Sequence, residues 1–141
     1  MKYPAIFTPD HETGGFIVTF RDLPEAITQG DDEHEAFEMA EDALVTCMDF
    51  YFDDKRPVPL PSAPYPGDKL IELPPSVAAK VLLLNEMLAQ NMRPVDLARR
   101  MNARTQDISR LLNLKHATKI DAIAMAARAL GKSILDFAIS K

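Results

Sequence analysis

The sequence predicts an α+β protein with a β-rich first half and an all-helical second half. Residues 1–73 contain short segments of strand-forming residues separated by glycine and proline, together with one long helical pattern. From residue 75 onward, apolar residues recur at three- and four-residue steps, as they do on the buried faces of helices. We therefore expect a small antiparallel sheet with one long helix, a proline-rich linker and a helical C-terminal region.

The charge of the chain is divided between the same two halves. Residues 1–73 contain 16 Asp or Glu and 5 Lys or Arg, a net charge of −11, whereas residues 74–141 contain 5 acidic and 11 basic residues, a net charge of +6. A basic region gains free energy at a phosphate backbone through counterion release, and an acidic region is repelled from it. The division favours two modules with different partners, although the acidic surface could also serve solubility alone.

Four strands are expected in the first half. Residues 3–8 and 16–20 are rich in β-formers and flank a turn with two adjacent glycines, and residues 26–29 could form a short third strand. Residues 70–73 alternate in polarity and are expected to return to the same sheet as its fourth strand.

A long helix is expected after the third strand. Asp31 and Asp32 are suitable N-terminal caps, and the helix should end before Pro57. Its apolar stripe consists of Phe37, Ala40, Leu44, Cys47, Met48 and Tyr51. Such a stripe packs on one face of a sheet. Cys47 lies on this stripe, so we interpret it as core filling and not as a nucleophile.

Five prolines between residues 57 and 66 can neither continue a helix nor donate hydrogen bonds to a sheet. They favour an extended, semi-rigid connector, with a proline-rich ligand for an adaptor domain as the alternative. The predicted organisation is an N-terminal α/β domain of residues 1–56 with the strand at 70–73, a linker of residues 57–69, and a C-terminal helical domain of residues 74–141.

The helical domain is expected to contain five helices. The first begins near Pro75, and two short ones follow it. The fourth is predicted to start with a capping box formed by Thr118 and Asp121 and to stop at Gly131, and a short fifth helix is expected from Ser133.

Residues 93–113 predict two short helices joined by a tight turn, the layout of a DNA-reading helix-turn-helix. Asn102 falls where the turn needs a left-handed residue, and Ile108 and Leu111 would anchor the second helix. The outward face would then carry Thr105, Gln106, Ser109 and Arg110, with Arg99, Arg100 and Arg104 close by for phosphates. The alternative is an ordinary helical hairpin with a solvated basic face.

Catalytic chemistry is not indicated. The three histidines have no metal-ligand spacing to one another or to Cys47, and neither a phosphate-binding loop nor a nucleophile elbow occurs. The carboxylates most nearly placed for a metal cluster are Asp10, Asp22 and Asp49, which come from a turn, a bend and a helix. We expect no enzyme activity, no metal and no cofactor.

The chain is also expected to be cytoplasmic. Its single cysteine excludes an intramolecular disulfide, which suits a reducing compartment. No apolar run approaches the length of a bilayer span, and the first residues lack the apolar core of a signal peptide.

Taken in order, these features resemble the HicB antitoxins of bacterial toxin–antitoxin modules, from residue 1 to about residue 132. The resemblance is carried by KYPAIFTPDHETGGFIVTFRDLPEAITQGDDEHEA, DALVTCMDFYFDD and NLKHATKIDAIAMAARALGK, together with the Cro-repressor-type helix-turn-helix. It implies a partial, catalytically degraded RNase H-like fold that masks HicA, a small mRNA-cleaving ribonuclease, through residues within 1–73. It also implies binding of the C-terminal domain to the module's own operator, as a dimer or larger assembly. Asn102 departs from the glycine that such repressors often have.

The repressor pattern also assigns roles along the second helix. Thr105, Gln106 and Arg110 would face bases, Ser109 a base or a phosphate, and Arg104 and Asn113 phosphates. Gln can pair with adenine and Arg with guanine in the major groove. Two alternatives stay open: a repressor without a toxin partner whose N-terminal domain binds a small ligand, and a residual nuclease that uses clustered carboxylates with Mg²⁺.

Overall fold

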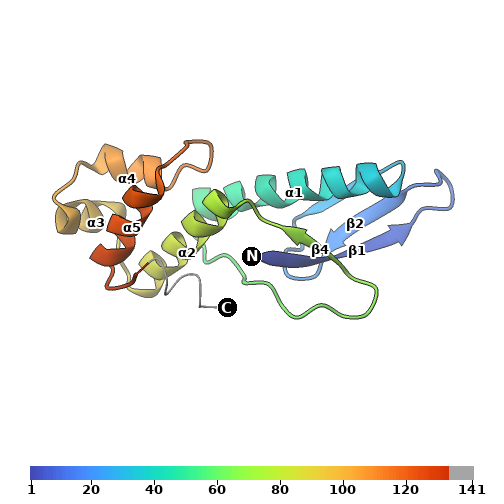
Figure 1. The fold of residues 1–141 in the computed structure, drawn as a ribbon, viewed down its shortest axis with the longest axis horizontal. Helices are drawn as coiled ribbons and strands as arrows, with labels where there is room; N and C mark the ends of the chain where they lie inside the picture. The colour runs from blue at the N-terminus through green and yellow to red at the C-terminus, as the bar shows by residue number, and fades with distance from the viewer. Residues whose placement is uncertain (134–141) are drawn as a thin grey trace. The chain divides into compact units, whose positions relative to one another are not determined.

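The computed structural model describes residues 1–133. Its contacts divide the chain into two compact units, one formed by residues 1–50 and 59–73 and the other by residues 51–58 and those from 74 onward. The first unit holds the sheet, and the second holds helices α2 to α5 (Figure 1). The predicted α+β class is therefore confirmed, whereas the assignment of three regions with a linker at 57–69 stays a prediction.

The first unit is built on one antiparallel sheet with the strand order β3-β2-β1-β4. The strands are β1 (Lys2–Pro9), β2 (Phe16–Phe20), β3 (Ile27–Gly30) and β4 (Lys69–Glu72). All four predicted strands are present, and the third and fourth are displaced by one residue from their predicted bounds. Because β1 pairs with both β2 and β4, the first and last strands of this unit lie side by side, with β4 at the edge of the sheet.

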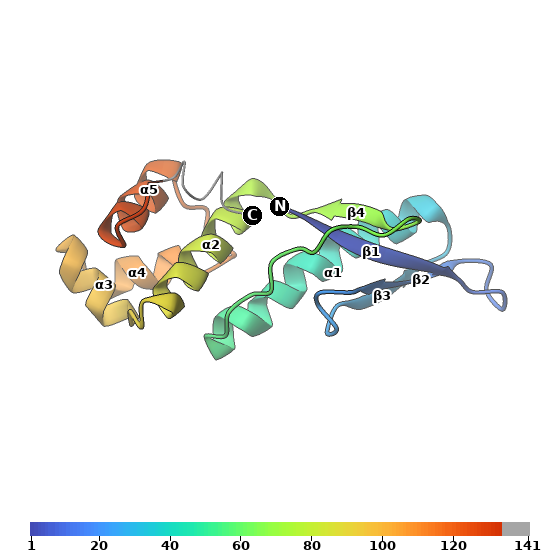
Figure 2. The same cartoon turned by 90° about the horizontal axis from the view of Figure 1, so that it is seen from below.

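Helix α1 (Glu33–Asp54) lies across one face of the sheet, and seen from below the strands lie in front of it (Figures 1 and 2). Phe37 of its predicted stripe packs on Phe7 of β1 at a ring distance of 4.9 Å, and the other five residues of the stripe are buried. Asp32 caps the helix, since its Oδ1 accepts the N–H of Glu35 at 2.8 Å. Asp31 does not cap it: its own N–H donates to the Glu35 carboxylate.

The strand β3 and the start of α1 approach each other at Gly30. A Cβ atom added there would meet the backbone of Ala36 and Glu35 at less than a van der Waals contact. Only glycine allows this approach without a shift of the backbone.

The proline-rich segment is attached to the first unit from Pro59 onward. The hydroxyl of the buried Tyr3 donates to the carbonyl of Pro59 at 2.7 Å, and the backbone N–H of Ser62 donates to Asp22 at 2.9 Å. Further along, Arg21 forms an ion pair of 2.8 Å with Asp68. Residues predicted as a connector therefore belong to the contacts that hold this unit together.

The second unit packs four helices of the described chain around one apolar core: α2 (Pro75–Ala89), α3 (Pro94–Met101), α4 (Thr105–Leu111) and α5 (Ile120–Ala129). Gly131 has the positive φ of 81° expected where a helix stops, which confirms that prediction. The predicted last helix from Ser133 lies outside the described residues apart from its first one. In residues 1–133 no helix is long and apolar enough to cross a membrane.

The predicted capping box at the start of α5 is wrong. Lys119 occupies the cap position, and no side chain there bonds the first turn. The hydroxyl of Thr118 instead donates to the carbonyl of His116 at 3.4 Å. The cap and the start of the helix lie one residue later than predicted, and Thr118 is used within the preceding loop.

Candidate DNA-binding surface

Helices α3 and α4 form the predicted helix-turn-helix geometry. Asn102, which ends α3, has φ 53° and ψ 43°, the left-handed conformation that the turn was expected to need. Leu97 and Ala98 of α3 are buried, and Ile108 and Leu111 of α4 are buried beside them in one cluster. The side of α4 opposite these anchors is therefore left to face solvent.

Both helices begin with an arginine followed three residues later by an aspartate. Asp96 accepts the backbone N–H of Arg93 at 3.0 Å and also its guanidinium Nε at 3.0 Å. The Arg93 guanidinium holds the pKa of the Asp96 carboxyl at about 2. Asp107 repeats the arrangement at α4, accepting the N–H of Arg104 at 3.2 Å. Each aspartate supplies half of a capping box, a role that the sequence reasoning missed because arginine is not a usual capping residue.

All six candidate contact residues are exposed: Arg104, Thr105, Gln106, Ser109, Arg110 and Asn113. Two of them have local hydrogen bonds. The Ser109 hydroxyl donates to the carbonyl of Thr105 at 3.2 Å, and the amide oxygen of Asn113 accepts the N–H of Lys115 at 3.0 Å. The Ser109 oxygen and the Asn113 amino group keep the capacity to meet a nucleic acid, but their assigned roles stay predictions.

Three of the four arginines of this surface lie within 4.0 Å of a carboxylate. Arg104 and Arg110 both approach Oδ1 of Asp107, at 3.6 and 3.8 Å, so one carboxylate draws two guanidinium groups together. Arg99 lies 4.0 Å from Asp96, and Arg100 donates to the carbonyl of Ala129 at the end of α5. The structure thus brings Arg104 and Arg110 together and directs Arg100 to another helix.

Lys80 is a residue of this region that the sequence reasoning missed. It is 2% exposed, and its ammonium group donates to the carbonyls of Arg110 at 3.3 Å, Asn113 at 2.7 Å and His116 at 2.7 Å. Burial lowers the pKa of Lys80. A signal was available, because Lys80 shares a helix face with Val77 and the other apolar residues of α2.

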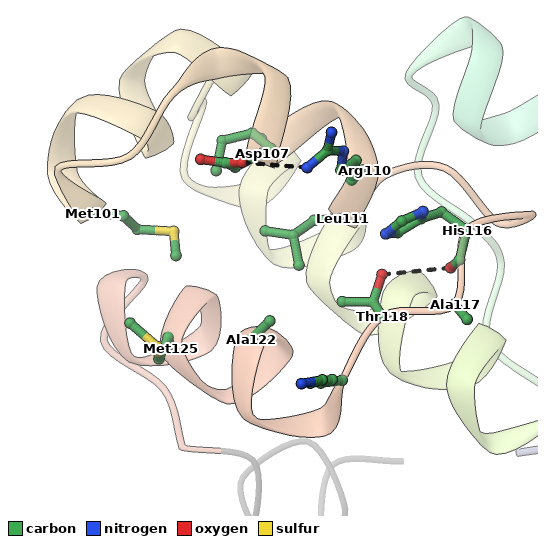
Figure 3. Close-up of a pocket in the computed structure, with 11 residues that line it drawn as sticks. Met101, Asp107, Arg110, Leu111, His116, Ala117, Thr118, Ala122 and Met125 are labelled. Atoms are coloured by element: carbon green, nitrogen blue, oxygen red, sulfur yellow. Dashed lines mark hydrogen bonds and ion pairs between the residues drawn. The ribbon is translucent and has the colours of Figure 1, made fainter.

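A cavity of about 410 Å³ lies between α4 and the start of α5 (Figure 3). Met101, Leu111, Ala122 and Met125 point toward it, and the ion pair between Asp107 and Arg110 lies at its edge. Its lining is mainly apolar, so the cavity offers few groups for chemistry.

No metal centre accompanies these features. Among the residues that the structure describes, no three His, Cys, Asp or Glu side chains are grouped to hold a metal ion. Asp10, Asp22 and Asp49 are not brought together. Asp22 binds Ser62 in the proline-rich segment, and Asp10 accepts the N–H of Glu12 in the first turn.

Comparison with known proteins connects both units to one family. Residues 2–82 match a family described as the HicB-like antitoxin of bacterial toxin–antitoxin systems. The chain is 53% identical over 134 residues to Antitoxin HicB of Escherichia coli, covering 95% of this chain and 96% of that protein. It is 50% identical to Antitoxin HicB 2 of Photorhabdus laumondii, covering 95% and 94%, and 34% identical to Antitoxin HicB of Pseudomonas fluorescens, covering 88% and 86%. The family match ends within α2, whereas the relatives align over most of the chain.

Proposed function

Since the chain belongs to the HicB-like antitoxin family of bacterial toxin–antitoxin systems, we propose that it has two tasks in the bacterial cytoplasm. The acidic first unit binds and neutralises a HicA-type toxin, a small basic ribonuclease that cleaves mRNA. The second unit binds operator DNA and represses the operon that encodes both proteins. The chain catalyses no reaction of its own and requires no cofactor, in keeping with a family of antitoxins.

The charge of the first unit supports toxin binding. Five basic residues in residues 1–73 cannot neutralise 16 acidic ones, so a large negative surface remains. Several of these acids are exposed along α1: Glu33, Glu35, Glu38, Glu41 and Asp42. A negative surface attracts the basic RNA-binding face of the toxin and accelerates association. Once bound there, the antitoxin would exclude the mRNA substrate from that face.

The two-sided character of α4 is the observation that carries the DNA-binding proposal. Ile108 is fully buried, while the polar side chains on the opposite side are exposed. Gln106 and Arg110 have the donors and acceptors that distinguish adenine and guanine in the major groove, and Arg104 can neutralise a phosphate. A homodimer or larger assembly would present two such helices to half-sites about one helical turn apart.

Two measurements test the proposal. Co-expression with the small basic protein encoded beside this gene should give a complex that survives purification and has the mass of both chains. The purified chain should also bind the DNA upstream of its operon more tightly than a scrambled duplex of equal length, typically by a factor of about 10³ or more at physiological salt. Equal affinity for the two duplexes would contradict the proposed repressor task.

The alternative is a repressor without a toxin partner whose N-terminal domain binds a small ligand, and the cavity beside α4 does not bear on it because it lies in the second unit. Such a protein would show sequence-specific DNA binding and no complex with a neighbouring gene product. Its operator affinity would change on addition of that ligand.

A further inference from the structure

Lys80 is the one buried polar or charged residue among residues 1–133, and neither proposed task uses it. It lies on α2, three residues after Val77 and one before Val81, both of which are buried. An ammonium group in such a place loses its water and must have full hydrogen bonding in return. At 2% exposure it cannot itself contact a phosphate.

The three carbonyls around Lys80 supply that bonding. A lysine ammonium has three N–H donors, and each finds one acceptor: the carbonyls of Arg110, Asn113 and His116. Arg110 is in the last turn of α4, where a positive charge is favoured, and its carbonyl accepts the N–H of Asn113 at 3.2 Å besides the Lys80 ammonium. One buried group thus binds the end of α4 and the loop that leads to α5.

Two of these three residues are candidate DNA contacts. The backbones of Arg110 and Asn113 are attached to Lys80, while their side chains are exposed. A binding side chain works only when its backbone is held within about 0.5 Å of the productive position. We infer that Lys80 is a positioning residue for operator reading, whose ammonium group sets where the end of α4 presents Arg110 and Asn113. This inference rests on the proposed DNA binding of the second unit.

The first test replaces Lys80 in the full chain by methionine, which keeps the length and apolar stem but has no donor. A matched control is Leu83→Ala or Leu83→Val, whichever has the melting temperature nearest to that of Lys80→Met. Leu83 is fully buried in the core cluster of the second unit. Both variants are titrated with operator and scrambled DNA at a temperature at which both are folded.

We expect Lys80→Met to lower operator affinity about tenfold or more, comparable to loss of one base contact, with little change for scrambled DNA. The control should change neither affinity by more than about twofold, since it leaves the reading surface in place. The dependence on salt should not change in Lys80→Met, because Asn113, the assigned phosphate contact that Lys80 positions, is uncharged and releases no counterion. An equal loss in the control would assign the effect to stability and overturn the inference.

A chemical rescue separates the charge from the shape of the side chain. In a Cys47→Ala background the variant Lys80→Cys has one thiol, which can be aminoethylated in denaturant before refolding. The product restores an ammonium on a stem of lysine length, whereas carboxamidomethylation does not. Aminoethylation should recover operator discrimination and carboxamidomethylation should not. Equal discrimination by the two products would overturn the inference.

Hydrogen exchange measures, without DNA, whether Lys80 holds the loop after α4. The His116 amide donates to the carbonyl of Asn113 at 3.1 Å, in the loop that Lys80 holds. In Lys80→Met this amide should exchange about tenfold faster, relative to core amides of α5, because the loop opens locally. Unchanged exchange would show that Lys80 does not hold the loop.

The titrations also distinguish this inference from the proposed function. If wild-type chain binds operator and scrambled DNA equally, the repressor task itself fails. If Arg110→Ala weakens operator binding and Lys80→Met does not, only the role of Lys80 fails.

Discussion

The two units of this chain treat their carboxylates differently. In the second unit Asp96 and Asp107 each accept the backbone N–H that starts a helix, and arginines lie beside them. In the first unit acids outnumber bases by 14 to 3, so most of them cannot be paired within it. Asp32 also caps a helix in the first unit, so the difference between the units is the excess of acids in the first one, which forms a negative surface. A chain can hold a basic protein and DNA only if its charges are segregated in this way, because each partner is repelled by the other's site.

The largest expected effect comes from reversing the charge of the first unit. Glu38, Glu41 and Asp42 lie on one side of α1 and are exposed. Changing all three to lysine should abolish neutralisation of the toxin in a growth assay, since like charges brought together cost several kcal/mol. Operator affinity should not fall.

The matched control is Asp121→Lys, an exposed reversal in the second unit that should leave neutralisation intact. Neutralisation that survives the triple reversal would contradict an electrostatic interface on α1. The exposed apolar side chains on the other face of the sheet, Ile6, Ile17 and Ile27, would then be the next surface to change.

A smaller effect is expected from Gly30→Ala, which tests whether the units are stable separately. The added methyl would collide with the backbone of Ala36, and overpacking of this kind costs about 1–3 kcal/mol. Amides of the sheet should lose protection from hydrogen exchange, while those of α4 and α5 keep theirs. Equal loss in both units would mean that they unfold as one. Glu38→Ala, on the exposed side of α1, is a control that should cost little.

Within the second unit, Arg110→Ala and Arg104→Ala should differ. Loss of a base contact at Arg110 should weaken operator binding by about 1–3 kcal/mol and relax specificity, whereas loss of a phosphate contact at Arg104 should weaken all duplexes alike and reduce the salt slope by about 1. Titrations of both variants at several salt concentrations measure this. Identical behaviour of the two would refute the division of roles along α4.

The smallest expected effect concerns Asp96. Because Arg93 holds the pKa of this carboxyl at about 2, below the ordinary value of 3.8, its ionised form is favoured in the folded state. Its contribution to stability is therefore present above pH 4 and is lost as the pH falls toward 2. Thermal melts between these values should show a weaker pH dependence in Asp96→Asn than in the wild type. If the melting temperature of Asp96→Asn depends on pH as strongly as that of the wild type, the loss of stability in acid comes from other carboxyl groups.

Much of the fold and of the candidate site could be predicted, because it depends on neighbours along the chain. β-forming residues between glycine and proline predicted the first three strands, and alternation predicted the fourth. A stripe at helical spacing predicted the buried face of α1, and of the two cap candidates, Asp31 and Asp32, the second caps the helix. The left-handed Asn102 and the buried Ile108 and Leu111 followed from the spacing of a single motif.

Sequence patterns predicted helix caps less well where one side chain had two possible hydrogen-bond partners close by. Thr118 has the pattern of a capping residue, yet its hydroxyl bonds the carbonyl of His116 and α5 begins later. The Arg–Asp caps of α3 and α4 were missed because the capping group is the third residue of the helix and not the first.

The sequence by itself determined the fold class, the separation of charge and the polar face of α4, since periodicity and composition are properties of the chain. Only the tertiary structure decided that Lys80 binds carbonyls 30 to 36 positions later, and that Tyr3 holds Pro59 across 56 positions. A buried donor takes whichever acceptor the packing brings to it. The partner therefore depends on how the core packs, and the spacing of residues along the chain does not predict it.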